Sequence, residues 1–214
     1  MRTYLSPIGY NTTSVTRVLL SRGIEAGDTV VLLRPASDAD NGRGEEAITD
    51  VTRMLEEIEP NLSVEVKRIP HEQFPTAVLT CSNLLRAAEG HVIVNLGGGA
   101  RDILLPFTIA VLAHASQIDT ALMFSDIDGQ VREWELPLLT ADISRSTQET
   151  LERIANSDDS VTVPQLDEQM STAKSTITRH VSLLDESGLV QTWIDGKTKH
   201  TQITLTGKLL LDEI

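Results

Sequence analysis

Short apolar segments that alternate with longer amphipathic segments fill the first two thirds of this sequence. Residues 29–33 and 92–94 are almost uninterrupted hydrophobic runs, as strands buried on both faces are. Between them lie segments with apolar residues at helical spacing, such as residues 45–58. This alternation favours an α/β fold with a Rossmann-like, mostly parallel sheet covered by helices on both faces.

The predicted strands are residues 2–6, 29–33, 62–66, 92–94, 120–124 and 131–136, and the predicted helices are residues 11–22, 45–58, 74–88 and 103–115. Asp128 and Gly129 read as a tight turn before the last of these strands. We therefore expect an antiparallel hairpin at one edge of the sheet.

Three consecutive glycines, Gly97, Gly98 and Gly99, directly follow the fourth predicted strand and precede a helix. Backbone N–H groups at a helix N-terminus attract anions, above all phosphate, and glycine lets a ligand approach the main chain. Arg101 would neutralise the anion, and Asn95 would either bind a base edge or ribose hydroxyl or hold the loop. The alternative interpretation is that the glycines form only a tight turn.

A second polar loop, Ser6-Pro7-Ile8-Gly9-Tyr10-Asn11, follows the first predicted strand. Because ligands bind beyond the carboxyl ends of parallel strands, the two loops are expected to line one crevice. The predicted ligand-binding residues are Ser6, Pro7, Ile8, Gly9, Tyr10, Asn11, Asn95, Gly97, Gly98, Gly99 and Arg101. No Gly-Lys-Ser/Thr follows the glycines, and Asp102 replaces the last glycine of the dinucleotide fingerprint, so we expect neither a Walker A loop nor NAD.

The pattern changes near residue 144, where we divide the chain into domains 1–144 and 145–214. Predicted helices span residues 146–155, 163–169 and 173–186, and predicted strands span residues 189–194 and 201–205 around an Asp195-Gly196-Lys197 turn. Thr206 is expected to cap a last helix. This order is that of a winged helix-turn-helix domain.

The segment STAKSTITRHVSLLDESGLV resembles the recognition helix and following strand of MarR- and ArsR-like regulators. The residues predicted to contact DNA are Ser171, Thr172, Lys174, Ser175, Thr178 and Arg179 of the helix and Lys197, Lys199 and His200 of the wing. Residues 145–214 hold seven basic and eleven acidic residues. This acidic excess supports the alternative of a protein–protein interaction module.

The whole chain is acidic, with a formal net charge of −13. An acidic, lysine-poor surface suits concentrated salt, so a halophilic host is one hypothesis and an ordinary acidic protein the other. The scattered histidines predict no metal site, and Cys81 reads as a small buried hydrophobe. Since no apolar run approaches the ~18 residues of a membrane span and no signal peptide is evident, we expect a cytoplasmic protein without a membrane partner.

The segments SPIGYN and NLGGGARDI, followed by a winged helix, resemble the CRISPR-associated transcription regulators, which join a CARF (CRISPR-associated Rossmann fold) domain to a winged helix. That family's glycine loop has the form Asn-x-Thr/Ser-Gly-Gly-x-Lys/Arg. Asn95, Gly98, Gly99 and Arg101 fit it, whereas Gly97 replaces the hydroxyl residue.

The resemblance implies an archaeal protein that forms a homodimer, and the acidic surface favours a haloarchaeal host. Its two CARF domains would share one two-fold pocket for a cyclic oligoadenylate, most often cyclic tetra-adenylate, with no other cofactor. The winged helices would bind double-stranded promoter or CRISPR-leader DNA and regulate CRISPR loci.

Three functions remain open at this point. The chain is a ligand-sensing regulator, a ring nuclease that cleaves the cyclic nucleotide, or a DNA-binding repressor that needs no ligand. Ser6, Asn95 and Arg101 could align a ribose hydroxyl for cleavage, but Asp102 is the only acid near the glycines that could act as a general base. We therefore assign no catalytic residue and favour the sensor.

Overall fold

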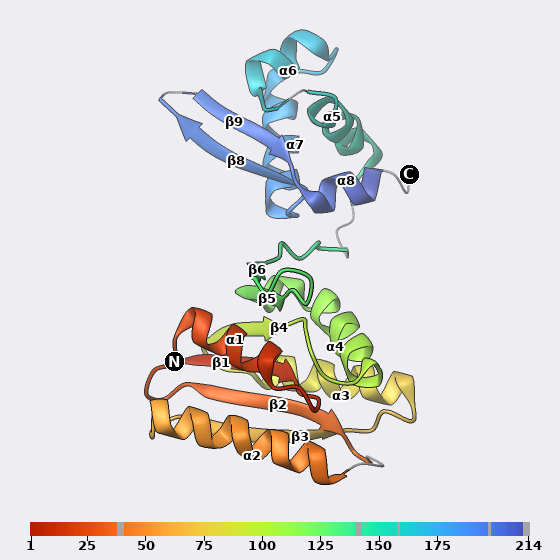
Figure 1. The fold of residues 1–214 in the computed structure, drawn as a ribbon. Helices are drawn as coiled ribbons and strands as arrows, with labels where there is room; N and C mark the ends of the chain where they lie inside the picture. Colours follow the sequence, from red (N-terminus) through yellow and green to blue (C-terminus); the bar gives the residue numbers. More distant parts are fainter. Residues whose placement is uncertain (38–40, 140–142, 158, 197, 212–214) are drawn as a thin grey trace. The chain divides into compact units, whose positions relative to one another are not determined.

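A computed structural model describes residues 1–37, 41–139, 143–157, 159–196 and 198–211 of the chain (Figure 1). Two compact units make up the structure, Met1–Glu135 and Leu136–Ile214.

The first unit is built on one six-stranded sheet. Its strands are β1 (Arg2–Pro7), β2 (Thr29–Pro35), β3 (Ser63–Ile69), β4 (His91–Asn95), β5 (Thr120–Phe124) and β6 (Val131–Glu133). They lie in the order β3-β2-β1-β4-β5-β6, and every neighbouring pair is parallel except β5 and β6. The predicted Rossmann-like α/β fold and its antiparallel edge hairpin are confirmed.

Helices cover both faces of this sheet, as Figure 1 shows. They are α1 (Thr13–Arg22), α2 (Asn41–Ile58), α3 (Phe74–Ala87) and α4 (Arg101–Ala113), with a short 3-10 turn at Ala115–Gln117. The apolar stripes of α1 and α2 form one core with inward side chains of β1, β2, β4 and β5. Helices α3 and α4 pack against each other on the other face. Full coverage explains why the central strands are apolar on both sides.

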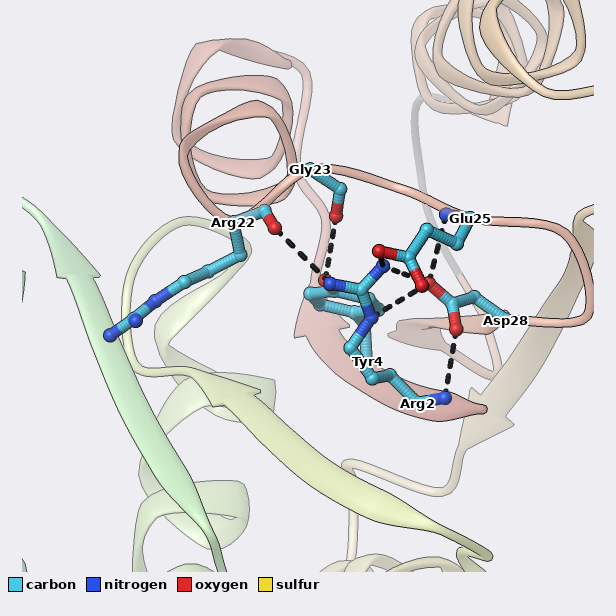
Figure 2. Close-up of polar contacts among 6 residues, drawn as sticks. All are labelled: Arg2, Tyr4, Arg22, Gly23, Glu25 and Asp28. Atoms are coloured by element: carbon cyan, nitrogen blue, oxygen red, sulfur yellow. Dashed lines mark hydrogen bonds and ion pairs between the residues drawn. The ribbon is translucent and has the colours of Figure 1, made fainter.

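An ion pair between Arg2 and Asp28 closes the amino-terminal edge of the sheet (Figure 2). The Asp28 carboxylate, 1% exposed, accepts hydrogen bonds from the backbone N (2.8 Å) and Nε (2.9 Å) of Arg2 and from the backbone N of Glu25 (3.0 Å). Arg2 Nη1 also donates to the carbonyl oxygen of Arg22 at 3.2 Å. One side chain of β1 thus fixes both the end of α1 and the turn into β2.

The second unit packs helices against a small antiparallel sheet. Its elements are α5 (Arg145–Ala155), β7 (Val161–Thr162), α6 (Val163–Gln169), α7 (Lys174–Glu186), β8 (Val190–Asp195), β9 (Thr198–Ile203) and α8 (Leu205–Leu211). The strands lie in the order β7-β9-β8. Thr162 and Gln165 form a capping box at the start of α6, where Pro164 occupies the first turn as predicted. The arrangement is a winged helix-turn-helix domain.

The end of this unit differs from the sequence prediction in two places. Strand β9 begins at Thr198 rather than at residue 201, because Asp195 of β8 pairs directly with Thr198. The polar residues from Thr198 to His200 belong to the strand because each of them pairs with a residue of β8. Thr206 lies inside α8, where its hydroxyl accepts a hydrogen bond from the backbone N of Leu138 at 2.9 Å. Thr204 acts at the start of α8 instead, since its hydroxyl accepts from the backbone N of Gly207 at 3.2 Å.

The buried carboxylate of Asp28 makes a testable contribution to stability. Burial raises its pKa, but the hydrogen bonds from Arg2 and Glu25 outweigh that effect, so the pKa lies below its ordinary value. We expect Asp28→Asn to lower the free energy of unfolding by about 2–3 kcal/mol at pH 7, because a hydrogen-bonded charge is lost. Asp50→Asn, at an exposed ion pair with Arg53, is the control and should change it by less than about 1 kcal/mol.

The same measurement repeated against pH tests the sign. A carboxylate with a depressed pKa stabilises the fold above its unfolded pKa of about 3.9 and loses that contribution as pH falls through the folded value. Urea unfolding should therefore show the Asp28→Asn difference in full above about pH 5 and a shrinking difference below about pH 4. A difference that grows toward acid pH would contradict this assignment.

Candidate functional site

The two predicted ligand loops lie side by side at the carboxyl edge of the sheet. β1 pairs with β4, so the loop from β1 to α1 and the loop from β4 to α4 leave the sheet next to each other. The strand order reverses direction here, because β2 and β3 continue on one side of β1 while β4 and β5 lie on the other. Crevices at such switch points are the usual ligand sites of open α/β sheets.

The side-chain amide of Asn95 joins the two loops. Its Nδ2 donates to the hydroxyl of Ser6 at 2.9 Å and to that of Ser14 at 3.4 Å, and its Oδ1 accepts from the backbone N of Gly97 at 3.0 Å. Asn95 and Ser6 are each only 2% exposed. Of the two roles that the sequence left open for Asn95, the structure shows the one in which it holds the loop.

Close packing between the loops accounts for the glycines. Gly98 and Gly99 have φ angles of +79° and +72°, which side chains tolerate poorly. A Cβ on Gly99 would lie 2.7 Å from Cβ of Pro7, and one on Gly98 would lie 3.1 Å from Oγ of Ser14. The backbone of Gly99 also lies against Gly9, whose own Cβ would be 3.3 Å from Cα of Gly99. Packing against the neighbouring loop is therefore enough to explain why these positions are glycine.

The predicted ligand-binding residues divide by exposure. Tyr10, Asn11 and Arg101 are exposed, Gly9, Gly98 and Gly99 are half-buried, and Ser6, Pro7, Ile8, Asn95 and Gly97 are buried. Asn11 Oδ1 accepts from the backbone N of Thr13 at 2.9 Å and so supports the start of α1. Arg101, in the first turn of α4, places a positive charge beside the helix N-terminus. The exposed members present a surface, and the buried members shape the backbone beneath it.

Three residues at this edge were not predicted from the sequence. Ser14 packs against Gly97 and Gly98 from the first turn of α1. Arg34, near the end of β2, and Arg43, in the first turn of α2, place their guanidinium carbons 6.0 and 4.7 Å from the ring centroid of Tyr10. A charged residue at the end of an apolar strand, as in TVVLLRP, was the available signal for Arg34.

The predicted DNA-contacting residues lie largely on the outer surface of α7 and the wing. Ser171, Lys174, Ser175, Thr178, Arg179 and Lys199 are exposed, and Thr172 and His200 are half-buried. Lys197 lies outside the described residues. His200 is stacked on Trp193 of β8, with ring centroids 5.6 Å apart, and its Nδ1 lies 3.3 Å from the hydroxyl of Ser160. Thr178 Oγ1 donates to the carbonyl oxygen of Lys174 at 2.9 Å and keeps its acceptor capacity.

The inner face of α7 is fixed to α5 by apolar packing and one polar contact. Ile177, Val181 and Leu184 are buried, as predicted. His180 is 2% exposed, and its Nδ1 lies 2.8 Å from the hydroxyl of Thr150 on α5. Burial is the main cause that lowers the pKa of His180, which favours the neutral ring. The outer residues of α7 therefore stand on a well-anchored helix.

A hollow of about 260 Å³ lies elsewhere on the first unit. It is lined by residues from β1, β2, β3 and the end of α3, among them Met1, Thr29 and Glu89. Met1, Thr29 and Glu89 lie next to the amino ends of β1, β2 and β4, so this hollow is distinct from the glycine loops. Ligands of open α/β sheets bind beyond the carboxyl ends, so the glycine edge is the stronger candidate.

Other kinds of site find little support within the described part of the chain. No group of three His, Cys, Asp or Glu side chains there is placed to hold a metal ion. Nor does any helix among these residues have the length and apolarity to cross a membrane. Cys81 is buried, and burial raises the pKa of its thiol to about 11, so it is present as the unreactive thiol at neutral pH.

Comparison with known proteins shows that most of the chain matches one domain family. Residues 2–135 match the profile of the Csa3 CRISPR-associated Rossmann-like domain. No curated protein is significantly similar to the chain.

Solved structures resemble either most of the chain or about a third of it. Can2 from Sulfobacillus thermosulfidooxidans, solved with cyclic tetra-adenylate, is 13% identical, with 97% of this chain and 62% of Can2 covered and a TM-score of 0.45. Csm6 from Enterococcus italicus, bound to cyclic hexa-2'-fluoro-hexa-dAMP, is 14% identical, with 87% and 55% covered and a TM-score of 0.48. The chain thus spans about half to two thirds of the length of these two proteins. HlyU from Vibrio cholerae N16961, in its reduced form, is 21% identical over 33% of this chain and 73% of its own, with a TM-score of 0.28.

The loop packing predicts how glycine substitutions affect stability. Gly129→Ala, at a φ of +70° with nothing within 4 Å of the new Cβ, should lower the free energy of unfolding by about 1–2 kcal/mol through backbone strain alone. Gly99→Ala has the same strain and also meets Pro7, so we expect a further loss of about 1–3 kcal/mol.

Urea unfolding of the full chain can isolate the first unit. The sequence has two tryptophans, so in a Trp193→Phe background the fluorescence of Trp134 reports on that unit alone. Equal destabilisation by the two glycine substitutions would contradict the close packing of the loops.

Proposed function

This chain belongs to the Csa3 CRISPR-associated Rossmann-like domain family, and from that membership we propose that it is a ligand-sensing transcriptional regulator of CRISPR loci. In this proposal the first domain binds a cyclic oligoadenylate, with cyclic tetra-adenylate as the first candidate, and the winged helix binds double-stranded DNA at a promoter or CRISPR leader.

One observation carries the ligand half of the proposal. Two neighbouring strands end in loops whose backbones are locked together, and an exposed arginine stands at the helix N-terminus beside them. Backbone N–H groups, the helix dipole and Arg101 all favour a phosphate there. A cyclic oligoadenylate repeats a phosphate at every nucleotide, so a symmetric pair of such edges suits it. We therefore propose that the protein acts as a homodimer around one ring.

Sensing fits the side-chain geometry better than ring cleavage. Ser6 and Asn95, two of the residues that could align a ribose hydroxyl, are buried and bonded to each other. Asp102, the acid nearest to the glycines, is exposed in the first turn of α4. The proposal accordingly assigns no residue a catalytic role.

The DNA half of the proposal rests on α7. This helix presents short hydroxyls and two positive charges outward, and buried Ile177, Val181 and His180 hold it against the domain core. Side chains of this kind reach between phosphates and base edges in the major groove. The wing adds Lys199 beside the helix-turn-helix. Although the domain is acidic overall, the positive charges of this surface determine the local field.

Calorimetry with cyclic tetra-adenylate, cyclic hexa-adenylate and linear oligoadenylate tests the ligand assignment. We expect one ring per two chains, and at about a hundredfold the dissociation constant a gain of ~2.7 kcal/mol in the free energy of unfolding. Arg101→Ala should weaken binding about tenfold, and more at low salt, since a charge-assisted contact is lost. Arg86→Ala, at the end of α3, removes an exposed arginine elsewhere and should leave affinity unchanged. Failure of every ring to bind would leave a DNA-binding regulator without a ligand.

The DNA assignment requires a duplex selected from a random-sequence pool by the parent protein. Lys174→Ala and Arg179→Ala should each weaken binding to that duplex by about 1–3 kcal/mol if they read a base, and uniformly across sequences if they contact phosphate. Lys208→Ala on α8 removes the same charge outside α7 and the wing, so it controls for net charge. If both α7 variants bind like the parent, the second domain is better explained as a protein-interaction module.

A further inference from the structure

The ring of Tyr10 stands directly beside the locked loops. It follows Gly9, whose backbone lies against Gly99, and the Tyr10 side chain is still 45% exposed. Burial of a large aromatic side chain is favourable, so a half-exposed tyrosine at the proposed ligand edge offers ring surface that a ligand can cover.

Two arginines from a third part of the sheet edge gather at this ring. Arg43 is exposed on the first turn of α2 and lies 4.7 Å from the ring centroid, within cation–π range. Arg34 is 1% exposed near the end of β2, with its guanidinium carbon 6.0 Å from the same centroid. A Cβ on Gly44 would lie 1.9 Å from Arg34 Nη2, so the first turn of α2 has a glycine where the Arg34 side chain passes. The sequence of α2 thus makes room for Arg34 beneath the ring.

This grouping is unusual in an acidic chain of net charge −13. Together with Arg101 at the start of α4, the Tyr10 group gives the carboxyl edge an aromatic ring and three arginines.

We infer that Tyr10 and Arg43 form a subsite for one purine nucleotide unit of the ligand, with Arg34 as the positioning residue that holds Tyr10. The purine stacks on the exposed part of the Tyr10 ring, and the Arg43 guanidinium binds the attached phosphate. This inference rests on the proposed function. It adds to that function a base-reading element, since backbone amides and Arg101 bind phosphate whatever the base is.

The aromatic ring is the reason to assign a nucleotide rather than a free phosphate. A phosphate alone is bound by N–H groups and arginines and gains nothing from a phenol face, whereas base–aromatic stacking adds free energy for each base. The competing interpretation is that the Tyr10–Arg43 contact only ties the start of α2 to the β1–α1 loop. That interpretation predicts an effect on stability and none on affinity.

The test measures the affinity of the full chain for cyclic tetra-adenylate in four variants. Tyr10→Leu removes the ring, and we expect binding to weaken about five- to a hundredfold. Tyr10→Phe keeps the ring and should bind close to the parent. Arg43→Gln should weaken binding about tenfold at low salt and less at high salt. Arg53→Gln, an exposed arginine later on α2 that pairs with Asp50, is the matched control and should bind like the parent.

Base dependence gives a second readout that a structural role would not move. Cyclic tetra-uridylate offers the same phosphates with smaller bases, so the loss caused by Tyr10→Leu should be larger for the adenylate ring than for the uridylate ring. Melting temperatures of the ligand-free variants separate folding from binding. We expect all four variants to melt close to the parent, because the side chains of Tyr10, Arg43 and Arg53 are exposed.

The outcomes separate this inference from the proposed function. A parent protein that binds no cyclic oligoadenylate overturns the proposed function and the subsite with it. A parent that binds, with Tyr10→Leu and Arg43→Gln binding equally well, overturns the subsite alone. Lower melting temperatures with unchanged affinity would show that the Tyr10–Arg43 contact is only a structural tie.

Discussion

The amide of Asn95 is the contact on which the arrangement of the proposed ligand edge depends. Parallel strands in register bring the ends of β1 and β4 together, but two loops that leave the same edge can still diverge. Asn95 prevents this by bonding Ser6 and Ser14 on one loop and helix and Gly97 on the other, all away from water. A buried amide that lost these partners would cost about 1–3 kcal/mol, so the bonds hold the loops to one geometry. The backbone contact between Gly9 and Gly99 follows from that geometry, and so does the direction in which α4 and Arg101 leave the sheet.

Electrostatics at this edge is local rather than global. An excess of thirteen negative charges would repel an anionic ring at low salt, yet at high ionic strength the Debye length falls to ~3 Å and distant charges are screened. What acts on a bound phosphate is then only what touches it: backbone amides, the first turn of α4 and the arginines nearby. The same argument applies to α7, where Lys174 and Arg179 face outward on a domain with more acids than bases. An acidic chain can bind two polyanions on this basis if each surface concentrates its few cations.

The fold could be predicted from the sequence because the patterns that indicate each strand and helix are local. Period and hydrophobicity located all six strands and four long helices of the first unit, and the turn at Asp128-Gly129 predicted the antiparallel edge. The wing strand was misplaced because strand pairing, not side-chain character, determines that Thr198 already belongs to β9. At the candidate site, both loops could be identified from the sequence, but their buried residues could not be told from their exposed ones. Whether Asn95 faces a ligand or Ser6 depends on the register of β1 with β4, which no single segment encodes. The contacts of Ser14 and Arg34 are equally long-range, so neither residue was predicted, although a charge at the end of an apolar strand was an available signal for Arg34.

Burial therefore decides which residues can report on function. A residue that shapes the loops contributes to the free energy of unfolding and to any ligand site at once, so a substitution at Gly98, Gly99 or Asn95 removes both together. An exposed residue such as Arg101 can change affinity while the backbone stays in place. The distinction explains the composition of the two loops. Their glycines, proline and amide are fixed by each other, and the freedom to vary, and hence to set what the edge binds, lies in the side chains at its rim. Tyr10, Arg43 and Arg101 occupy that rim on three different connections of the sheet, so ligand preference can change without altering the loops that support it.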